Sequence, residues 1–180
     1  MQEKLQKIKF VITDVDGVLT DGLLHYDANG EALKSFHVRD GLGIRMLMEH
    51  GIQVAVLSGR SSPILQKRID DLGIKLAYLG KLEKESACFD LIRQAGVTPE
   101  ETAYIGDDSV DLPAFAVCGL AFAVNDAPIY VQNNADYVLT QAGGKGAFRE
   151  MSDMILQAQG KMESFSTAKG FLKTVINMAQ

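Results

Sequence analysis

Acidic residues gather where two strand-like segments of the sequence end. Asp14 and Asp16 follow the segment KFVIT, and Asp107, Asp108 and Asp111 follow the segment AYIG. Two carboxylates at positions i and i+2 point to the same side of an extended chain. If both segments end at one edge of a sheet, five carboxylates converge, and their repulsion is unfavourable without a cation. An oxygen-rich site for Mg²⁺ accounts for such a cluster.

Each acidic residue also has a purely structural interpretation. Asp14 could cap an element, and Asp16 could belong to a turn with Gly17. Asp107, Asp108 and Asp111 could form a capped start of a helix that matches the helix dipole. These interpretations account for each residue alone, but they leave the convergence of all five unexplained.

Polar residues follow a further strand-like segment, and one lysine begins a predicted helix. Ser58, Gly59 and Arg60 come directly after QVAVL, and Lys84 lies in GKLEKESACFDLI. A serine in the place of Ser58 is, taken alone, more often a helix N-cap than a ligand contact. A lysine in the first turn of a helix is unfavourable for the helix dipole, so Lys84 either has a specific role or is a solvated surface residue. Lys81 is the alternative cation.

Short apolar segments alternate with helical patterns along the chain, which predicts an α/β fold with a doubly wound, mostly parallel sheet. The predicted strands are 9–13, 53–57, 76–79, 103–105, 120–124 and 137–139. The predicted helices are 42–49, 63–72, 83–95, 112–117, 128–134 and 147–159. Ligands bind at the carboxyl edge of such sheets, where the polar residues fall. Residues 1–160 are expected to form one domain, and 161–180 a tail that is helical or disordered.

The pair Asn29-Gly30 lies between strand-like residues and predicts a β-hairpin after the first strand. An isolated hairpin is too small to bury its own apolar side chains. We therefore expect a symmetric oligomer in which hairpins of different subunits pack together. The apolar residues assigned to this surface are Leu23, Leu24, Tyr26, Leu33 and Phe36.

Four motifs in order resemble those of the haloacid dehalogenase superfamily of phosphohydrolases: DVDGVLTDG, LSGR, the lysine of GKLEK, and GDDSVD. The resemblance implies that Asp14 is the nucleophile and Asp16 the general acid and base. It further implies phosphate or substrate contacts from Ser58, Gly59, Arg60 and Lys84. The implied Mg²⁺ ligands are Asp14, the Asp16 backbone carbonyl and Asp107, with Asp108 and Asp111 in support.

Longer segments, KSFHVRDGLGI, LSGRSSPI, YIGDDSVDLP and AGGKGAFRE, are similar to a group of this superfamily without a cap domain. Its members act on a small phosphorylated sugar acid in lipopolysaccharide precursor synthesis and form homotetramers. The resemblance implies that Lys145 reaches an anionic substrate, within or between subunits. The spacing of the motifs agrees with the absence of a cap domain, because only 25 residues lie between Ser58 and Lys84, too few for a lid domain.

Composition and charge exclude several classes of protein. The net charge of −5 comes without a basic stripe, which argues against nucleic acid as a partner. We expect no membrane span and a cytoplasmic location, because the sequence has no long apolar run and no secretory signal. The GGKG sequence lacks P-loop spacing. Cys88 and Cys118 lie in apolar surroundings and are expected to be buried, inert thiols.

Two other functions compete with a phosphatase. A receiver-type signalling module also carries a phosphorylated aspartate with Mg²⁺ and a lysine, but there the acidic pair precedes that aspartate. Turnover of excess phosphate ester distinguishes the two. A non-catalytic assembly module of the same fold would lack the nucleophile or the acid, whereas Asp14 and Asp16 are both present.

Overall fold

A single parallel sheet forms the centre of the molecule. The computed structural model describes residues 1–178, and the sheet in it has the strand order β5-β4-β1-β6-β7-β8. Every neighbouring pair is parallel. The strands are β1 (Phe10–Thr13), β4 (Gln53–Ser58), β5 (Leu76–Leu79), β6 (Thr102–Gly106), β7 (Leu120–Ala123) and β8 (Tyr137–Val138). All four residues of β1 are buried, as expected for a central strand covered on both faces.

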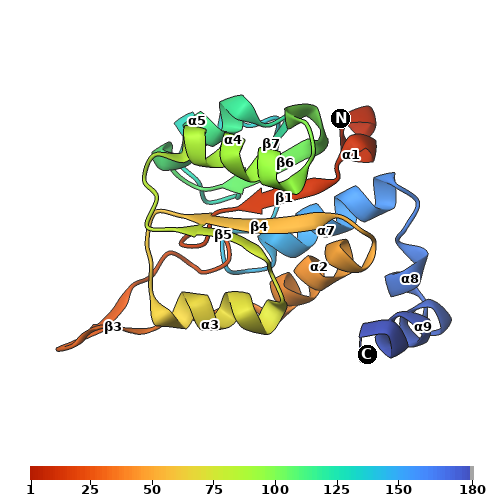
Figure 1. The fold of residues 1–180 in the computed structure, drawn as a ribbon, viewed down its shortest axis with the longest axis horizontal. Coiled ribbons are helices and arrows are strands. Elements are labelled where there is room, and N and C mark those ends of the chain that lie inside the picture. The colour runs from red at the N-terminus through yellow and green to blue at the C-terminus, as the bar shows by residue number, and fades with distance from the viewer. Residues whose placement is uncertain (179–180) are drawn as a thin grey trace.

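Helices cover both faces of the sheet. In Figure 1, α4 and α5 lie on one face, and α2, α3 and α7 lie on the other. The helices are α1 (Gln2–Lys7), α2 (Val38–Glu49), α3 (Pro63–Leu72), α4 (Lys84–Ala95), α5 (Leu112–Val117), α6 (Ile129–Gln132), α7 (Ala147–Ala158), α8 (Glu163–Ser166) and α9 (Ala168–Met178), with short 3₁₀ turns at Pro99–Glu101 and Ser109–Asp111. The predicted doubly wound α/β fold is therefore confirmed.

Glycine ends two of these helices. Gly73 and Gly96 follow α3 and α4 in the left-handed conformation, with φ of 76° and 70°. This conformation is strained for residues with a Cβ atom, so glycine stops the helix at low cost.

A β-hairpin projects from the body after β1 (Figure 1). Its strands β2 (His25–Asp27) and β3 (Gly30–Leu33) are antiparallel, as the Asn29-Gly30 pair predicts. Leu23 and Tyr26 are 62% and 60% exposed. Phe36 is different: it is half-buried against the core and lies under the Arg68 guanidinium, 5.4 Å from the ring centroid. Its assignment to the exposed hairpin surface was wrong, because the chain has already turned back to the core.

Within residues 1–178, no cap domain interrupts the sheet. The segment between β1 and α2 contains the hairpin, and the segment between β4 and α4 contains α3 and β5. The capless architecture is thus in agreement with the sequence. No helix in this part of the chain is long and apolar enough to cross a membrane.

Two elements differ from the sequence-based prediction. Helix α2 begins at Val38 instead of residue 42, because the His37 Nδ1 atom accepts a hydrogen bond from the Arg39 backbone N–H and caps the helix. Histidine is not among the usual N-cap residues, so the pattern gives no signal. Helix α1 was not predicted; its single buried residue, Leu5, offers too little apolar periodicity.

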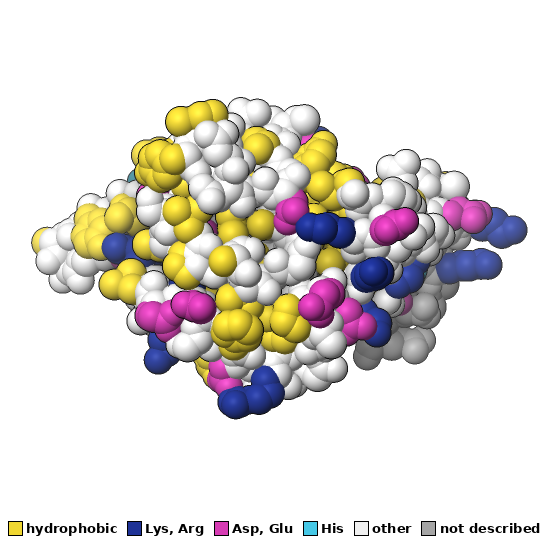
Figure 2. All heavy atoms as spheres, turned by 90° about the horizontal axis from the view of Figure 1, so that it is seen from above, with side chains coloured by type: hydrophobic (Ala, Val, Ile, Leu, Met, Phe, Trp, Pro, Cys, Tyr) yellow, Lys and Arg dark blue, Asp and Glu magenta, His cyan; other side chains and the backbone are white. Residues whose placement is uncertain are grey.

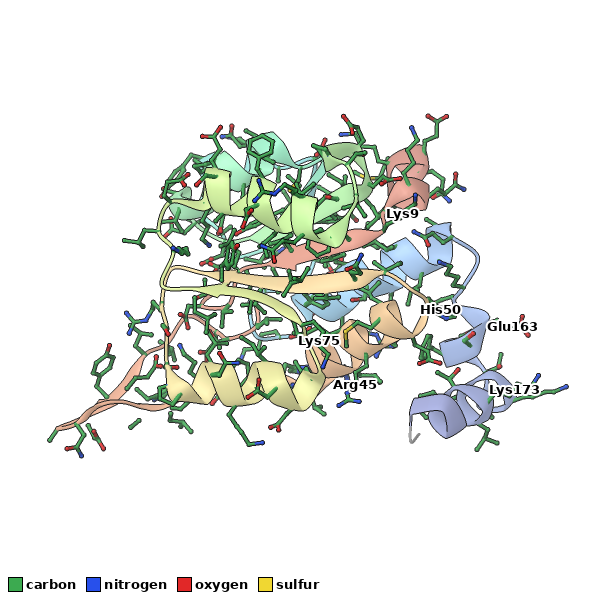
Figure 3. All side chains as sticks on the ribbon, in the orientation of Figure 1. Lys9, Arg45, His50, Lys75, Glu163 and Lys173 are labelled. Atoms are coloured by element: carbon green, nitrogen blue, oxygen red, sulfur yellow. The ribbon has the colours of Figure 1, made fainter. Side chains whose placement is uncertain are left out.

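The segment after α7 is helical, one of the two alternatives for the tail. His50, at the end of α2, packs edge-on against Phe165 of α8 with ring centroids 5.4 Å apart. Figure 3 shows His50 facing the segment that carries Glu163, with Lys173 farther out on α9. The division into a domain of residues 1–160 and a separate tail stays a prediction.

Exposed apolar side chains are unevenly distributed over the surface. Seen from above, they gather mainly on the part of the molecule nearer the hairpin, whereas charged side chains dominate toward the two termini (Figure 2). The carboxyl ends of the parallel strands also face the hairpin side (Figure 1). The edge that carries the candidate site thus borders the more apolar surface.

Candidate active site

Asp14 lies at the carboxyl end of the central strand. Its backbone N–H donates to the Ile105 carbonyl of β6 over 3.1 Å, which continues the sheet pairing beyond β1. The residue is 5% exposed. Gly17 follows with φ of +89°, and a Cβ atom there would lie 2.0 Å from the Asp107 Oδ2 atom. Only glycine fits this turn, which explains why DxDG ends in glycine.

Three carboxylates meet between β1 and β6. One oxygen each of Asp14, Asp107 and Asp111 lies within 4.8 Å of the others. Strands β1 and β6 are parallel neighbours with Thr13 opposite Ile105, so the chain segments that carry Asp14 and Asp107 leave the sheet next to each other. The convergence predicted from spacing is therefore present for these three residues.

Asp111 is fully occupied by hydrogen-bond donors. Its Oδ1 atom accepts from Lys84 Nζ at 2.6 Å and from the Tyr104 hydroxyl at 2.7 Å. Its Oδ2 atom accepts from the backbone N–H groups of Asp107 and Asp108. These four contacts make Asp111 an anchor for the loop and the lysine, and they leave Asp14 and Asp107 to face a cation. Asp108 is exposed, and its side chain accepts from the Ser109 N–H.

Lys84 is the cation of this cluster. Its ammonium group is fully buried and lies 3.1 Å from Asp14 Oδ1 and 2.6 Å from Asp111 Oδ1. The structure thus excludes a solvated surface lysine at this position. Lys81, the alternative, is exposed, and its backbone N–H donates to the Ser58 carbonyl. Tyr104 accepts from Lys84 at 3.2 Å, a partner that the sequence did not reveal.

Crowding of negative charge perturbs the protonation of the cluster. Burial, together with the Asp111 charge, raises the pKa of Asp14 to about 7, although Lys84 lowers it. Burial and the charges of Asp14, Asp111 and Asp108 raise the pKa of Asp107 to about 8. The negative charge therefore exceeds what Lys84 alone neutralises. A divalent cation would remove this excess, and the oxygen-only donor set suits a hard ion.

Asp16 points to a different set of partners, on the hairpin side. Its Oδ1 atom is ion-paired with Lys34, and its Oδ2 atom lies 3.8 Å from Arg60 Nε. Lys34 also lies 2.8 Å from the Glu31 carboxylate, and its side chain is 1% exposed. Sequence reasoning missed Lys34, because a lysine next to a hairpin is normally solvated and no local signal marks it.

The Oδ2 atom of Asp16 is buried and has no hydrogen-bond partner within the described chain. One oxygen of this carboxylate is thus fixed by Lys34, while the other has no hydrogen-bond partner. Such an arrangement suits a group that exchanges a proton with a bound molecule.

Ser58, Gly59 and Arg60 follow β4 at the same sheet edge. Ser58 is buried, and its hydroxyl accepts from the Arg60 N–H over 3.2 Å. A Cβ atom on Gly59 would lie 3.0 Å from Leu82 Cδ2. The Arg60 guanidinium donates to the Tyr26 hydroxyl at 2.5 Å, which ties this loop to the hairpin. Arg60 therefore lies near Asp16 rather than in the three-carboxylate cluster.

Lys145 is not brought to the acidic cluster in the single chain. Its side chain is exposed and, with Arg39 and Arg149, lines a cavity of about 370 Å³ beside α7. The two cysteines are buried as predicted, and the fold brings their Sγ atoms to 3.5 Å from each other.

Comparisons with known proteins identify the family. The family model of the haloacid dehalogenase-like hydrolases matches residues 37–119. The chain is 78% identical, over the full length of both, to a 3-deoxy-D-manno-octulosonate 8-phosphate phosphatase of Haemophilus influenzae. It is 45% identical to the phosphatase of the same name from Escherichia coli K12, over 93% of this chain and 87% of the relative.

Solved structures agree with the sequence matches. A cobalt-bound deoxy-D-mannose-octulosonate 8-phosphate phosphatase of Haemophilus influenzae superimposes with a TM-score of 0.93 at 79% identity, covering 94% of this chain and 99% of that one. A Moraxella catarrhalis 3-deoxy-D-manno-octulosonate 8-phosphate phosphatase, solved with magnesium, phosphate and the sugar acid, gives 0.88 at 37% identity over 91% and 94%. The chain therefore belongs to the haloacid dehalogenase-like hydrolases, in the family of the 3-deoxy-D-manno-octulosonate 8-phosphate phosphatases.

Proposed function

We propose that this protein hydrolyses 3-deoxy-D-manno-octulosonate 8-phosphate to the free sugar acid and phosphate, with Mg²⁺, through an aspartyl-phosphate on Asp14. The observation that carries the proposal is the buried contact of Asp14 with Lys84 beside Asp107 at the carboxyl edge of the sheet. The high identity to phosphatases of this name supports the substrate. Another small sugar phosphate is the alternative substrate.

Asp14 and Asp107 would hold the metal ion together with the Asp16 backbone carbonyl. Asp111 is an unsuitable ligand, because both its oxygens already accept hydrogen bonds. When bound, Mg²⁺ neutralises charge on the phosphoryl oxygens and so lowers their repulsion from the Asp14 carboxylate.

The first transfer moves the phosphoryl group from the sugar to the protein. A carboxylate oxygen of Asp14 attacks phosphorus, and the bond between phosphorus and the sugar oxygen breaks. Asp16 donates its proton to that departing oxygen. Lys84 and the Ser58 hydroxyl hold the phosphoryl oxygens, and Lys84 is fixed for this task by Asp111 and Tyr104.

The second transfer returns Asp14 to its starting state. Asp16, now a carboxylate, takes a proton from water while the water oxygen attacks phosphorus. The bond between phosphorus and the Asp14 oxygen breaks, and inorganic phosphate leaves. One difficult hydrolysis is thereby split into two easier steps. Lys34 holds the Asp16 carboxyl group by contact with Oδ1, and this contact becomes an ion pair once Asp16 has given up its proton.

The remaining expectations extend this proposal. A homotetramer would cover the exposed hairpin and could place Lys145 at the substrate of a neighbouring subunit, and the reaction would take place in the cytoplasm. A non-catalytic assembly role has little support, because the nucleophile, the acid and the lysine lie in mutually consistent places.

A substrate screen tests the proposed function. Phosphorylated sugars and sugar acids are incubated with the protein and Mg²⁺, and released phosphate is measured. We expect the highest kcat/KM for 3-deoxy-D-manno-octulosonate 8-phosphate, no turnover after chelation, and recovery with Mg²⁺. A higher kcat/KM for an unrelated sugar phosphate would assign another substrate, and full turnover in chelator would reject the metal-dependent mechanism.

A further inference from the structure

The glycine loop, residues 143–146, packs its backbone directly on the turn after β1. The Gly144 N–H donates to the Val18 carbonyl over 2.9 Å. A Cβ atom on Gly143 would lie 1.8 Å from the carbonyl oxygen of Gly17. The loop and the turn therefore touch through backbone atoms, which only a residue without a side chain allows.

Gly17 lies between this loop and the Asp107 carboxylate. On one side its carbonyl meets Gly143, and on the other its Cα faces Asp107, since an added Cβ would lie 2.0 Å from Asp107 Oδ2. Packed interiors transmit small displacements, because they contain few voids. A shift of the glycine loop would therefore move the turn that carries Asp16 and would change the space next to Asp107.

Two carboxylates from other elements hold the glycine loop and the first turn of α7 that follows it. Asp126, after β7, accepts from the Gly143 N–H over 2.9 Å. Asp40, on α2, accepts from the Arg149 N–H over 2.9 Å, in the first turn of α7. Gly146 is the N-cap residue of α7 and has no side chain to cap it, so Asp40 supplies the acceptor from 109 residues away.

Asp40 is placed for this contact by close packing of α2 on α7. A Cβ atom on Gly43 would lie 2.9 Å from Ser152 Oγ and 3.2 Å from the Arg149 Cα. Asp40 is 2% exposed, and its Oδ2 atom has no hydrogen-bond partner in the part of the chain that the structure describes. Burial of such a carboxylate is unfavourable unless it is compensated. The contact with the start of α7 is the compensation that the structure offers.

We propose that Asp40 and Asp126 are positioning residues that hold the glycine loop on the Gly17 turn and thereby fix the geometry of Asp16 and Asp107. This inference rests on the proposed function for its kinetic consequence. Neither carboxylate touches the reacting atoms. Asp126 accepts a hydrogen bond from the loop itself, and Asp40 accepts one from the first turn of α7, into which the loop continues.

Four variants test the proposal: Asp40→Ala, Asp126→Ala, the conservative Asp40→Asn and, as control, Leu156→Ala. Leu156 is buried on α7 and takes no part in the hydrogen bonds that Asp40 and Asp126 accept. Removal of either carboxylate should lower kcat for p-nitrophenyl phosphate about 10- to 100-fold, as expected when reacting groups are slightly misplaced, with a much smaller change in KM. Leu156→Ala should lower the melting temperature with little change in kcat. Asp40→Asn keeps an acceptor oxygen and should restore most of kcat.

Hydrogen exchange on the metal-free protein gives a readout that does not depend on turnover. Amides of residues 143–146 and 17–21 should exchange about tenfold faster in both carboxylate variants and at the parental rate in Leu156→Ala. Unchanged exchange in Asp126→Ala, or a kcat of the carboxylate variants equal to that of the control, would overturn the proposal. If Asp40→Ala does not fold, the result for Asp126→Ala decides the question, because Asp126 is exposed and its replacement should leave the fold intact. If the unaltered protein has no phosphatase activity, the proposed function is wrong. The hydrogen-exchange rates would still test whether the two carboxylates hold the glycine loop on the Gly17 turn.

Discussion

At the level of single residues, the acidic cluster has more carboxylates than one lysine can neutralise. Asp14, Asp107 and Asp111 share one buried lysine, Lys84. Without a metal ion, burial and mutual repulsion favour protonation of Asp14 and Asp107, whose pKa values rise to about 7 and about 8. The free energy of unfolding of the metal-free protein should therefore fall as pH rises, whereas ordinary ion-paired carboxylates make it rise.

The sign follows from proton binding by the folded and unfolded states. Because the pKa of Asp107 is higher in the folded state, the folded state holds its proton as pH rises, while the unfolded state loses it. The free energy of unfolding should therefore fall between about pH 4 and pH 8. Asp107→Asn removes this contribution. In chelator it should be more stable than the parent by about 5 kcal/mol at about pH 8 and nearly equal at about pH 4.

Urea unfolding with chelator at both pH values measures this difference. Addition of Mg²⁺ at the higher pH should stabilise the parent far more than Asp107→Asn, since a ligand stabilises only the state that binds it. If the unaltered protein is more stable than Asp107→Asn in chelator at the higher pH, the charged Asp107 carboxylate does not destabilise the folded state and the prediction is wrong.

At the scale of elements, the hairpin reaches back to the site through Lys34. Its buried ammonium lies between Asp16 and Glu31, while Arg60 links the β4 loop to Tyr26 of the hairpin. The hairpin is thus one wall of the site as well as an exposed ribbon.

Lys34→Met should therefore lower kcat about tenfold or more, because Asp16 loses the partner that orients it. The protein should also lose stability, since Glu31 and Asp16 are left close together without a cation between them. The matched control is Lys67→Met, which removes an exposed lysine paired with Asp71 on α3. Steady-state kinetics with 3-deoxy-D-manno-octulosonate 8-phosphate compare the two variants. Equal kcat values would mean that Lys34 plays no part in the reaction.

The sequence was sufficient for most elements and for part of the site. Strand alternation with helical patterns predicts all six sheet strands, and Asn29-Gly30 predicts the hairpin, because both signals are local. The convergence of Asp14 and Asp107 follows from parallel strand order. The roles of Lys34, Tyr104 and Asp40 could not be predicted, because each depends on a contact between segments that are distant in sequence.

At the scale of the whole molecule, the exposed hairpin indicates a partner surface. Leu23, Leu24, Tyr26 and Leu33 are 62%, 45%, 60% and 53% exposed. Apolar side chains grouped on one ribbon are typical of an interface. We predict a symmetric tetramer, in which neighbouring hairpins pack together and close the site that has no lid.

Leu24→Asp with Leu33→Asp should dissociate this tetramer, because charges cannot be buried unpaired between subunits. Both positions are exposed in the single chain, so the fold should persist. Light scattering gives the mass, and activity should fall more for the sugar-acid phosphate than for p-nitrophenyl phosphate. Lys67→Met again serves as a surface control. A monomeric parent with full substrate specificity would contradict the prediction.

The central claim is that Asp14 carries the phosphoryl group, and peptide mass spectrometry after acid quenching tests it most directly. The Asp16→Asn variant is mixed with Mg²⁺ and an activated aryl phosphate, whose leaving group needs no proton, so that the phosphoenzyme accumulates. We predict a phosphoryl adduct on Asp14 alone, and none when Asp14→Asn is added to this variant. A phosphoryl adduct on another residue, or release of the aryl alcohol by Asp14→Asn at the parental rate, would contradict the account.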